Sequence, residues 1–304
     1  MTYNYGNTKY KKIYYIPRKA APAPENESML LSKAIDGFIL TCRARRLSEH
    51  TISDYAYTFR IFLSHMGDMD ISRIESSQIT AFLASRRVGA KTVLNYHIGL
   101  SALWTWAIKE GYADKHVVHM VTKPKPKKVV IKPFSEIEVR AMFNGIRMFP
   151  ERDRAIILLL LDTGLRASEL VGLEKNDIDL AERRLKVLGK GNKERFLPFS
   201  SRTFSAVFKY LATLKPGEKP FPFSRTSLGH HIATIGDRVG VDAHPHRFRH
   251  TFAVTFLRNG GDPYTLQEML GHSTMEMVRI YLVIAQVDID SAHRKASPVE
   301  NWKL

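Results

Sequence analysis

A short stretch in the last quarter of the sequence combines positive charge, imidazole rings and a phenol. Two arginines and three histidines lie within seven residues, and a histidine and a tyrosine follow: His244, His246, Arg247, Arg249, His250, His272 and Tyr281. An arginine fork binds two phosphate oxygens, histidine transfers protons near neutral pH, and a tyrosine hydroxyl can act as a covalent nucleophile. The combination indicates chemistry on an anionic substrate.

Helix start and stop signals divide this stretch into three predicted short helices. The first lies near residues 252–258 and ends at a pair of glycines, which readily adopt left-handed backbone angles. Asp262 is the predicted N-cap of the second helix, which stops at Gly271. The third is predicted to open with Ser273 and Glu276 at capping-box spacing, and it carries the tyrosine.

In this order the residues resemble the C-terminal signature of the tyrosine recombinases, the phage-integrase and Xer group. The segments concerned are His246-x-x-Arg249-His250, Leu270-Gly271-His272-Ser273 and Tyr281. Upstream, Thr163-Gly164-Leu165-Arg166-Ala167-Ser168-Glu169-Leu170 resembles the family's first arginine motif, and Gly189-Lys190-Gly191-Asn192-Lys193-Glu194-Arg195 its lysine-bearing hairpin. Any one short pattern occurs by chance, but five in order make a specific match.

The resemblance implies an enzyme that cuts and rejoins DNA without a metal ion, another cofactor or ATP. Its catalytic residues would be Tyr281, Arg166, Lys190, His246, Arg249 and His272. The tyrosine would attack the phosphodiester to give a 3′-phosphotyrosine, while the arginines clamp the phosphate and the lysine protonates the leaving 5′ oxygen. The histidines would hydrogen-bond the transition state and assist proton transfer.

Taken singly, several of these residues have an ordinary structural interpretation. Arg166 could pair with Glu169 one turn later on a helix. Lys190 could be solvated in its glycine-rich turn, and His246 could be a satisfied loop histidine. Jointly, in family order, the catalytic interpretation is favoured, with Glu169 as the residue that positions Arg166.

The residues at the end of the pattern also allow two interpretations. His272 could cap a helix, and Tyr281 could be a core residue with its hydroxyl at the rim. His250 is expected to support the site, whereas Arg247 is expected to contact backbone phosphate. No set of metal ligands is predicted.

Composition narrows the class of partner. The chain has 304 residues, with Lys+Arg 46 against Asp+Glu 30 and a formal charge of +16, which favours a polyanion and nucleic acid above all. The longest purely apolar run, residues 155–161, is far shorter than the roughly 20 residues of a membrane-spanning helix. Cys42 is the single cysteine, so no intramolecular disulfide forms, which fits a reducing cytoplasm. No targeting segment is recognised.

The predicted fold is mainly α-helical, with two domains. Residues 1–28 form a basic arm or disordered tail, and 29–120 form a bundle of four amphipathic helices, the SAM-like core-binding domain that the resemblance implies. A basic linker is predicted at 121–133. It is either a plain tether or, as the resemblance implies, a segment that passes along the DNA while the two domains close around the duplex as a clamp. Residues 134–304 form the catalytic domain, mostly helical with a small antiparallel β-sheet, and a C-terminal tail.

A set of basic residues is predicted to contact DNA phosphates, although each alone could be an ordinary solvated side chain. One member of the set, Arg247, lies in the second domain. The others lie in the first domain and the linker: Arg43, Arg45, Arg46, Arg86, Arg87, Lys91, Lys123, Lys125, Lys127 and Lys128.

The function expected by resemblance is site-specific recombination of duplex DNA through a Holliday junction. Four protomers would pair two sites, with the C-terminal tail docked either on its own domain or on a neighbour. The basic arm favours an integrase of a phage or mobile element, and the alternative is an Xer-type resolvase of chromosome or plasmid dimers. Two rivals remain: a monomeric topoisomerase with the same chemistry, and a DNA-binding protein with a vestigial site.

Overall fold

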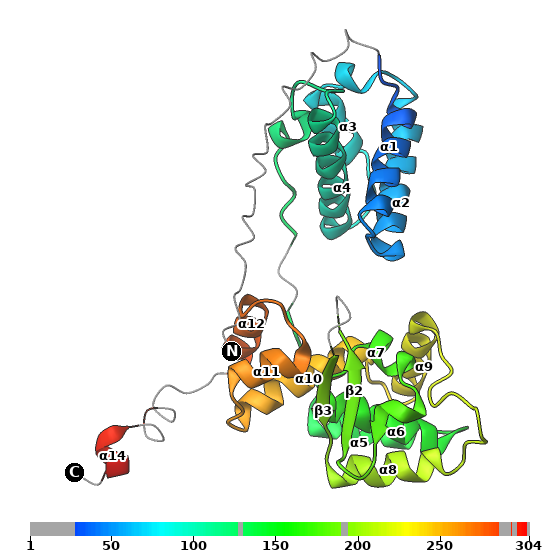
Figure 1. Cartoon of the computed structure of the whole chain (residues 1–304). Helices are drawn as coiled ribbons and strands as arrows, with labels where there is room; N and C mark the ends of the chain where they lie inside the picture. Colours follow the sequence, from blue (N-terminus) through cyan, green and yellow to red (C-terminus); the bar gives the residue numbers. More distant parts are fainter. Residues whose placement is uncertain (1–27, 127–129, 190–193, 286–292, 294–296, 303–304) are drawn as a thin grey trace, which may run out of the picture. The chain divides into compact units, whose positions relative to one another are not determined.

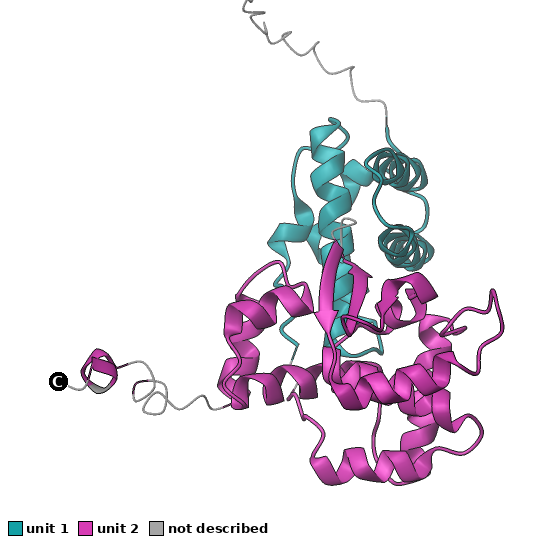
Figure 2. Cartoon of the chain, turned by 60° about the horizontal axis from the view of Figure 1, so that its bottom comes forward, with its two compact units in different colours: residues 1–128 teal, residues 129–304 magenta. Residues whose placement is uncertain are grey.

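The structure is a computed structural model that describes residues 28–126, 130–189, 194–285, 293 and 297–302. Contacts divide the chain into two units, Met1–Lys128 and Val129–Leu304 (Figure 2). The boundary falls inside the segment 121–133 predicted to be a basic linker. Three predicted site residues, Lys127, Lys128 and Lys190, lie outside the described residues, as do residues 1–27 of the predicted arm and most of the C-terminal tail.

The first unit is a small helical bundle, as predicted (Figure 1). Its helices are α1 (Leu31–Ala44), α2 (Glu49–Met66), α3 (Ser76–Ala84) and α4 (Ala90–Lys109), with the 3-10 turns η1 (Ile71–Arg73) and η2 (Val117–Met120). Ser48 caps α2 by accepting from the Thr51 amide, and Gly67 ends that helix.

Helix α3 has Glu75 as its N-cap, and the Gln78 side chain accepts from the Glu75 amide at 2.9 Å. The interior is aromatic: Trp104 is fully buried, and its ring lies edge-on to Phe62 with centroids 6.0 Å apart. Trp104 is therefore a core residue and not a platform for stacking bases.

The second unit combines helices with one small sheet. Its helices are α5 (Glu136–Gly145), α6 (Pro150–Thr163), α7 (Ala167–Gly172), α8 (Ser201–Leu211), α9 (Arg225–Asp237), α10 (Pro245–Arg258), α11 (Pro263–Leu270), α12 (Glu276–Ala285) and α14 (Pro298–Trp302), with the 3-10 turn η3 (Lys175–Asp177). The strands are β1 (Ile178–Asp179), β2 (Arg184–Leu188) and β3 (Glu194–Pro198), paired antiparallel in the order β1-β2-β3. The predicted small antiparallel sheet is confirmed.

Helix α6 runs through the main core of the second unit. Ile157, Leu159 and Leu160 are fully buried, so this helix is apolar on several faces. Gly164 ends it in the left-handed conformation, with φ of 64°. A second cluster of buried residues joins α10, α11 and α12, and it includes Tyr281.

Two predicted boundaries in the site-bearing stretch are wrong. Helix α10 begins at Pro245 rather than near residue 252, because His244 caps it by accepting from the Arg247 amide and proline fits the first helical turn. The histidine and arginine cluster is therefore helical. Helix α12 begins at Glu276, so this residue is the first of the helix and not the third residue of a capping box at Ser273. Asp262 and Gly271 bound α11 as predicted.

Within the described part of the chain, no helix has the length and apolar character required to cross a membrane.

Candidate active site

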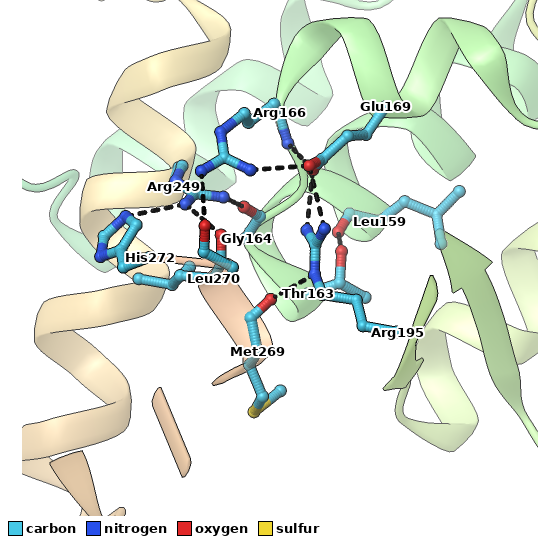
Figure 3. Close-up of polar contacts among 11 residues, drawn as sticks. Leu159, Thr163, Gly164, Arg166, Glu169, Arg195, Arg249, Met269, Leu270 and His272 are labelled. Carbon is cyan, nitrogen blue, oxygen red and sulfur yellow. Dashed lines mark hydrogen bonds and ion pairs between the residues drawn. The ribbon is translucent and has the colours of Figure 1, made fainter. Parts of the chain in front are cut away.

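Arg166 and Arg195 share one internal carboxylate (Figure 3). Nη1 of Arg166, at the N-terminus of α7, donates to Oε1 of Glu169 at 2.8 Å, and the Arg166 amide donates to Oε2 at 2.8 Å. Arg195, on β3, donates to both oxygens of Glu169 at 3.0 and 2.9 Å. The Glu169 side chain is 6% exposed against 36% for Arg166, so a buried carboxylate holds a guanidinium that reaches the surface.

The Glu169 carboxylate stays charged in this setting. Burial raises its pKa, but hydrogen bonds from Arg195 and Arg166 outweigh burial, so the pKa of Glu169 lies below its ordinary value. The ordinary pairing of Arg166 with Glu169 is thus confirmed. It does not compete with the catalytic interpretation, because Arg166 keeps donors that Glu169 does not use.

Arg249, on α10, is 1% exposed and binds the carbonyl ends of two helices. Its Nη1 donates to the Gly164 carbonyl at 2.9 Å, and its Nη2 donates to the Leu270 carbonyl at 2.6 Å. Arg166 donates to the Gly271 carbonyl at 3.2 Å. Carbonyls at helix C-termini lack a partner inside the helix and carry the negative end of its dipole. The ends of α6 and α11 therefore gather two guanidiniums at one place.

Positive charge is in excess at this point of the unit. Burial, and after it the charge of Arg166, lowers the pKa of Arg249 to about 10, so the guanidinium is still protonated near neutral pH. Among the described residues, Glu169 is the one carboxylate that binds Arg166 and Arg195, and its charge also acts on Arg249. The arrangement favours a bound anion.

His272 follows α11 directly and contacts the buried arginine. Its Nε2 lies 2.8 Å from Nη2 of Arg249, which can only donate, so Nε2 accepts. Its Nδ1 then carries the proton and is buried without a hydrogen-bond partner among the described residues. Burial, followed by the charges of Arg249 and Arg166, lowers the pKa of His272 to about 4. The imidazole is neutral near pH 7 and presents one unused donor.

Tyr281 lies in α12, is 4% exposed, and faces the same histidines. Its ring stacks on that of His272, with centroids 6.2 Å apart and 12° between the planes. Its hydroxyl is 3.0 Å from Nδ1 of His250. Burial raises the pKa of Tyr281, against the lowering effect of Arg249 and Arg166, so the hydroxyl keeps its proton at neutral pH.

His246 lies one turn before His250 on α10 and retains an exposed surface. The two imidazole rings meet edge to face, with centroids 4.2 Å apart. Desolvation by its neighbours, and after it the charge of Arg249, lowers the pKa of His246. Five of the six predicted catalytic residues therefore lie in one region of the second unit: Arg166, His246, Arg249, His272 and Tyr281. The sixth, Lys190, lies outside the described residues.

Arg247, which was predicted to contact backbone phosphate, has partners within the second unit. Its guanidinium donates to Glu138 at 2.6 Å and to the carbonyls of Asp242 and Lys132 at 2.6 and 3.0 Å. It also lies over the ring of Phe134, 4.1 Å from the centroid. With its side chain 12% exposed, Arg247 ties together parts of the second unit rather than facing solvent.

Arg195 is the site residue that sequence reasoning missed as a contributor. Besides Glu169, it binds the Met269 carbonyl at 2.9 Å through Nε, and so joins the strand β3 to the end of α11. The available signal was its position at the end of the lysine-bearing segment. Its partners are 26 and 74 residues away, and no local pattern identifies them.

The described residues of the first unit and the linker that are predicted to contact phosphate lie in three places. Arg43, Arg45 and Arg46 lie at the end of α1; Arg86, Arg87 and Lys91 lie between α3 and the first turn of α4; Lys123 and Lys125 follow η2. All are exposed except Arg86, which is half-buried over the ring of Phe82 and donates to the Ser85 hydroxyl. Among the described residues of the whole chain, no group of three or more His, Cys, Asp or Glu could hold a metal ion.

Comparison with known proteins matches both units. The model of the phage integrase family matches residues 132–286, and that of the phage integrase N-terminal SAM-like domain matches residues 35–111. The tyrosine recombinase XerA of Thermococcus onnurineus is 31% identical over 265 residues, covering 83% of this chain and 91% of the relative. The tyrosine recombinase XerD of Yersinia pestis is 28% identical over 299 residues, covering 90% and 99%.

Solved structures share the fold. The Tn1549 transposon integrase in complex with transposon right end DNA has a TM-score of 0.72 at 19% identity, covering 91% of this chain and 100% of that chain. A lambda integrase dimer bound to a COC′ core site has a TM-score of 0.71 at 19% identity, covering 82% and 97%.

Proposed function

Because the chain belongs to the phage integrase family of tyrosine recombinases, we propose that it recombines duplex DNA at specific sites with Tyr281 as the nucleophile. One observation carries the assignment of residues. A single imidazole, that of His272, bonds the buried guanidinium of Arg249 at 2.8 Å and stacks on the ring of Tyr281. A phosphate held by the guanidinium would therefore lie beside the phenol.

The cut strand passes through a covalent intermediate. Arg166 and Arg249 bind the non-bridging oxygens of the scissile phosphate, and the Nδ1–H of His272 supplies a further hydrogen bond to the transition state. The Tyr281 oxygen bonds to phosphorus as the bond to the 5′ oxygen breaks. The 5′ oxygen takes a proton from Lys190, a role that the resemblance to the family assigns to this residue. The 3′-phosphotyrosine conserves the bond energy, so rejoining needs no ATP.

Duplex DNA is the proposed partner. The formal charge of +16 and the exposed basic residues of the first unit support contacts with the backbone. We place these contacts at the ends of α1 and α3 and along the linker lysines, without Arg247. We place the reaction in the cytoplasm, a reducing compartment that the single cysteine fits.

Four protomers on two paired sites, exchanging strands through a Holliday junction, complete the proposal. The tail supports assembly because α14 exposes Val299 and Trp302, which are 57% and 71% exposed. These side chains suit docking on another apolar surface, either of the same chain or of a neighbouring protomer.

Two biological roles fit this chemistry. The basic N-terminal segment favours an integrase of a phage or mobile element. The Xer proteins among the relatives, at 28% and 31% identity over most of the chain, favour a resolvase of chromosome or plasmid dimers. Assays on an excised circular element and on a plasmid dimer, each carrying candidate sites from the source genome, distinguish the two roles.

The decisive experiment uses duplexes from the DNA flanking the gene, each carrying a nick near the cleavage position that traps the intermediate. Protein is mixed with them without metal, and denaturing gels are read for a covalent protein–DNA band. The band is expected with wild type and lost in Tyr281→Phe. A band that persists in Tyr281→Phe contradicts the assigned nucleophile. If wild type binds the duplexes but forms no adduct, a DNA-binding protein with a vestigial site is favoured. If the protein relaxes supercoiled plasmid without a recombination site at high dilution, a topoisomerase is favoured.

A further inference from the structure

The Tyr281 hydroxyl is bound by a histidine outside the proposed catalytic set. Nδ1 of His250 lies 3.0 Å from the hydroxyl oxygen, and the two ring centroids are 5.6 Å apart. No other hydrogen bond to this hydroxyl is found among the described residues. Helix α10 therefore holds the proposed nucleophile through His250, which is not one of the residues proposed to bind phosphate.

The direction of this hydrogen bond follows from burial. Tyr281 is 4% exposed, and a buried hydroxyl hydrogen needs an acceptor. Nδ1 of His250 can accept if the imidazole is neutral and carries its hydrogen on Nε2. Burial, and then the nearby His246 and His244, lower the pKa of His250 to about 4, which keeps its lone pair available at working pH. In this tautomer the phenol donates to His250.

We propose that His250 orients the Tyr281 hydroxyl and takes up its proton as the phosphotyrosine bond forms. This inference rests on the proposed function. The Oη–H bond of Tyr281 breaks as Oη bonds to phosphorus, the proton moves to Nδ1 of His250, and the 5′ oxygen leaves with a proton from the other side of the site. Rejoining runs in reverse, and the imidazolium returns the proton to the phenol.

A weakly basic imidazole is sufficient for this step. As Oη bonds to phosphorus, its proton becomes strongly acidic, so transfer late in bond formation is downhill even to a base of low pKa. The bound phosphate also brings negative charge close to α10. That charge offsets the repulsion from His246, His244 and Arg249, which contributes to the low pKa of His250 in the free protein.

Proton acceptance and simple positioning are separated by two variants. His250→Asn places an amide oxygen near the position of Nδ1, so it preserves an acceptor but cannot be protonated at working pH. His250→Ala removes both the hydrogen-bond acceptor and the group that takes up the proton, and it opens a space for added imidazole. Both variants are compared with wild type for DNA affinity, thermal unfolding and the rate of adduct formation on the nicked duplexes.

We expect both variants to bind DNA as wild type does and to form the adduct at least about 100-fold more slowly, the usual contribution of a positioned acid or base. Imidazole should accelerate His250→Ala and leave His250→Asn unchanged. If His250→Asn reacts within about threefold of wild type, or if imidazole fails to accelerate a folded His250→Ala, the inference is wrong.

A modified substrate separates the two ends of the reaction. Sulfur in place of the bridging 5′ oxygen leaves without a proton, so it should restore cleavage by Lys190→Ala but not by His250→Asn. Restoration of His250→Asn would assign His250 to the leaving group and overturn the inference. Loss of the adduct in wild type would instead count against the proposed function, so the two failures are distinguishable.

Discussion

Nη2 of Arg249 donates to Nε2 of His272 at 2.8 Å, and this bond determines the state of the histidine. Because a guanidinium has no acceptor, His272 must present a lone pair and carry its hydrogen on Nδ1. That hydrogen points to no protein acceptor among the described residues, although the atom is buried. This unused Nδ1–H is the donor that the proposed mechanism assigns to the transition state.

We expect unfolding to become easier as the pH falls below about 6.5, in part through His272. The pKa of this buried side chain is about 4 in the folded protein, below the ordinary value of 6.5, so the unfolded chain binds more protons between these two values. Stability is therefore present above pH 6.5 and is lost on acidification. Between about pH 6.5 and 5, His272 contributes at most about 2 kcal/mol to this loss.

The measurement is the free energy of unfolding in urea at several pH values, for wild type and for His272→Gln. The difference between them isolates His272, because His250, whose pKa is also lowered to about 4, is present in both. The slope should be smaller in His272→Gln. Equal slopes in the two proteins would contradict the neutral state assigned to His272.

Glu169→Gln should destabilise the second unit and slow cleavage. The substitution removes the charge shared by Arg166 and Arg195 and leaves two guanidiniums close together around a partner that is only 6% exposed. Breaking a buried ion pair at one partner costs about 3 kcal/mol. Urea unfolding measures the loss, and adduct formation measures the displacement of Arg166.

The matched control is Glu136→Gln. Glu136 pairs with Arg140 at 2.6 Å, but both side chains are about three-quarters exposed, at 76% and 75%. Exposed pairs contribute little, so this variant should unfold as wild type does. A similar loss in both variants would show that Glu169 holds no special position.

Gly164→Ala should disturb both the fold and the site. Gly164 has φ of +64°, and a Cβ there would lie 2.5 Å from Phe252 and 2.9 Å from Leu270. The left-handed conformation and the overlap together cost about 2 to 4 kcal/mol. Since the Gly164 carbonyl binds Arg249, adduct formation should fall as well.

Gly229→Ala is the control for this substitution. Gly229 lies within α9, and an added Cβ meets no atom within 4 Å. Alanine is the better helix former, so this variant should be unchanged or more stable by about 0.5 to 1 kcal/mol. Gly164→Ala with unchanged stability would contradict the role of this helix end.

Local chemistry made much of the second unit predictable. The cap at Asp262 and the stop at Gly271 need only neighbouring residues, and the structure has both. The start of α10 was missed because His244 is an unusual cap and polar side chains in the first turn obscured the helical period.

Relationships between distant residues were not predictable in the same way. The bond between Arg195 and the Met269 carbonyl depends on how β3 meets α11. For the same reason, the sequence could not show that Arg247, which is predicted to contact phosphate, is bound by Glu138 in the folded chain. A sequence shows which cations are present, and packing decides which of them remain free for a ligand.

The salt dependence of DNA binding tests this distinction between free and bound cations. Each phosphate contact that is lost should reduce the slope of log K against log salt by about 0.9. Replacing Lys123, Lys125, Lys127 and Lys128 by alanine should therefore reduce the slope by about 3 to 4 if all four meet phosphate.

Arg247→Ala should lower the unfolding temperature, because its four contacts within the second unit are lost, yet leave the slope unchanged. Fluorescence anisotropy across a salt series gives both slopes. An unchanged slope in the lysine variant would mean that the linker is a plain tether, and a reduced slope in Arg247→Ala would return that residue to the DNA-binding surface.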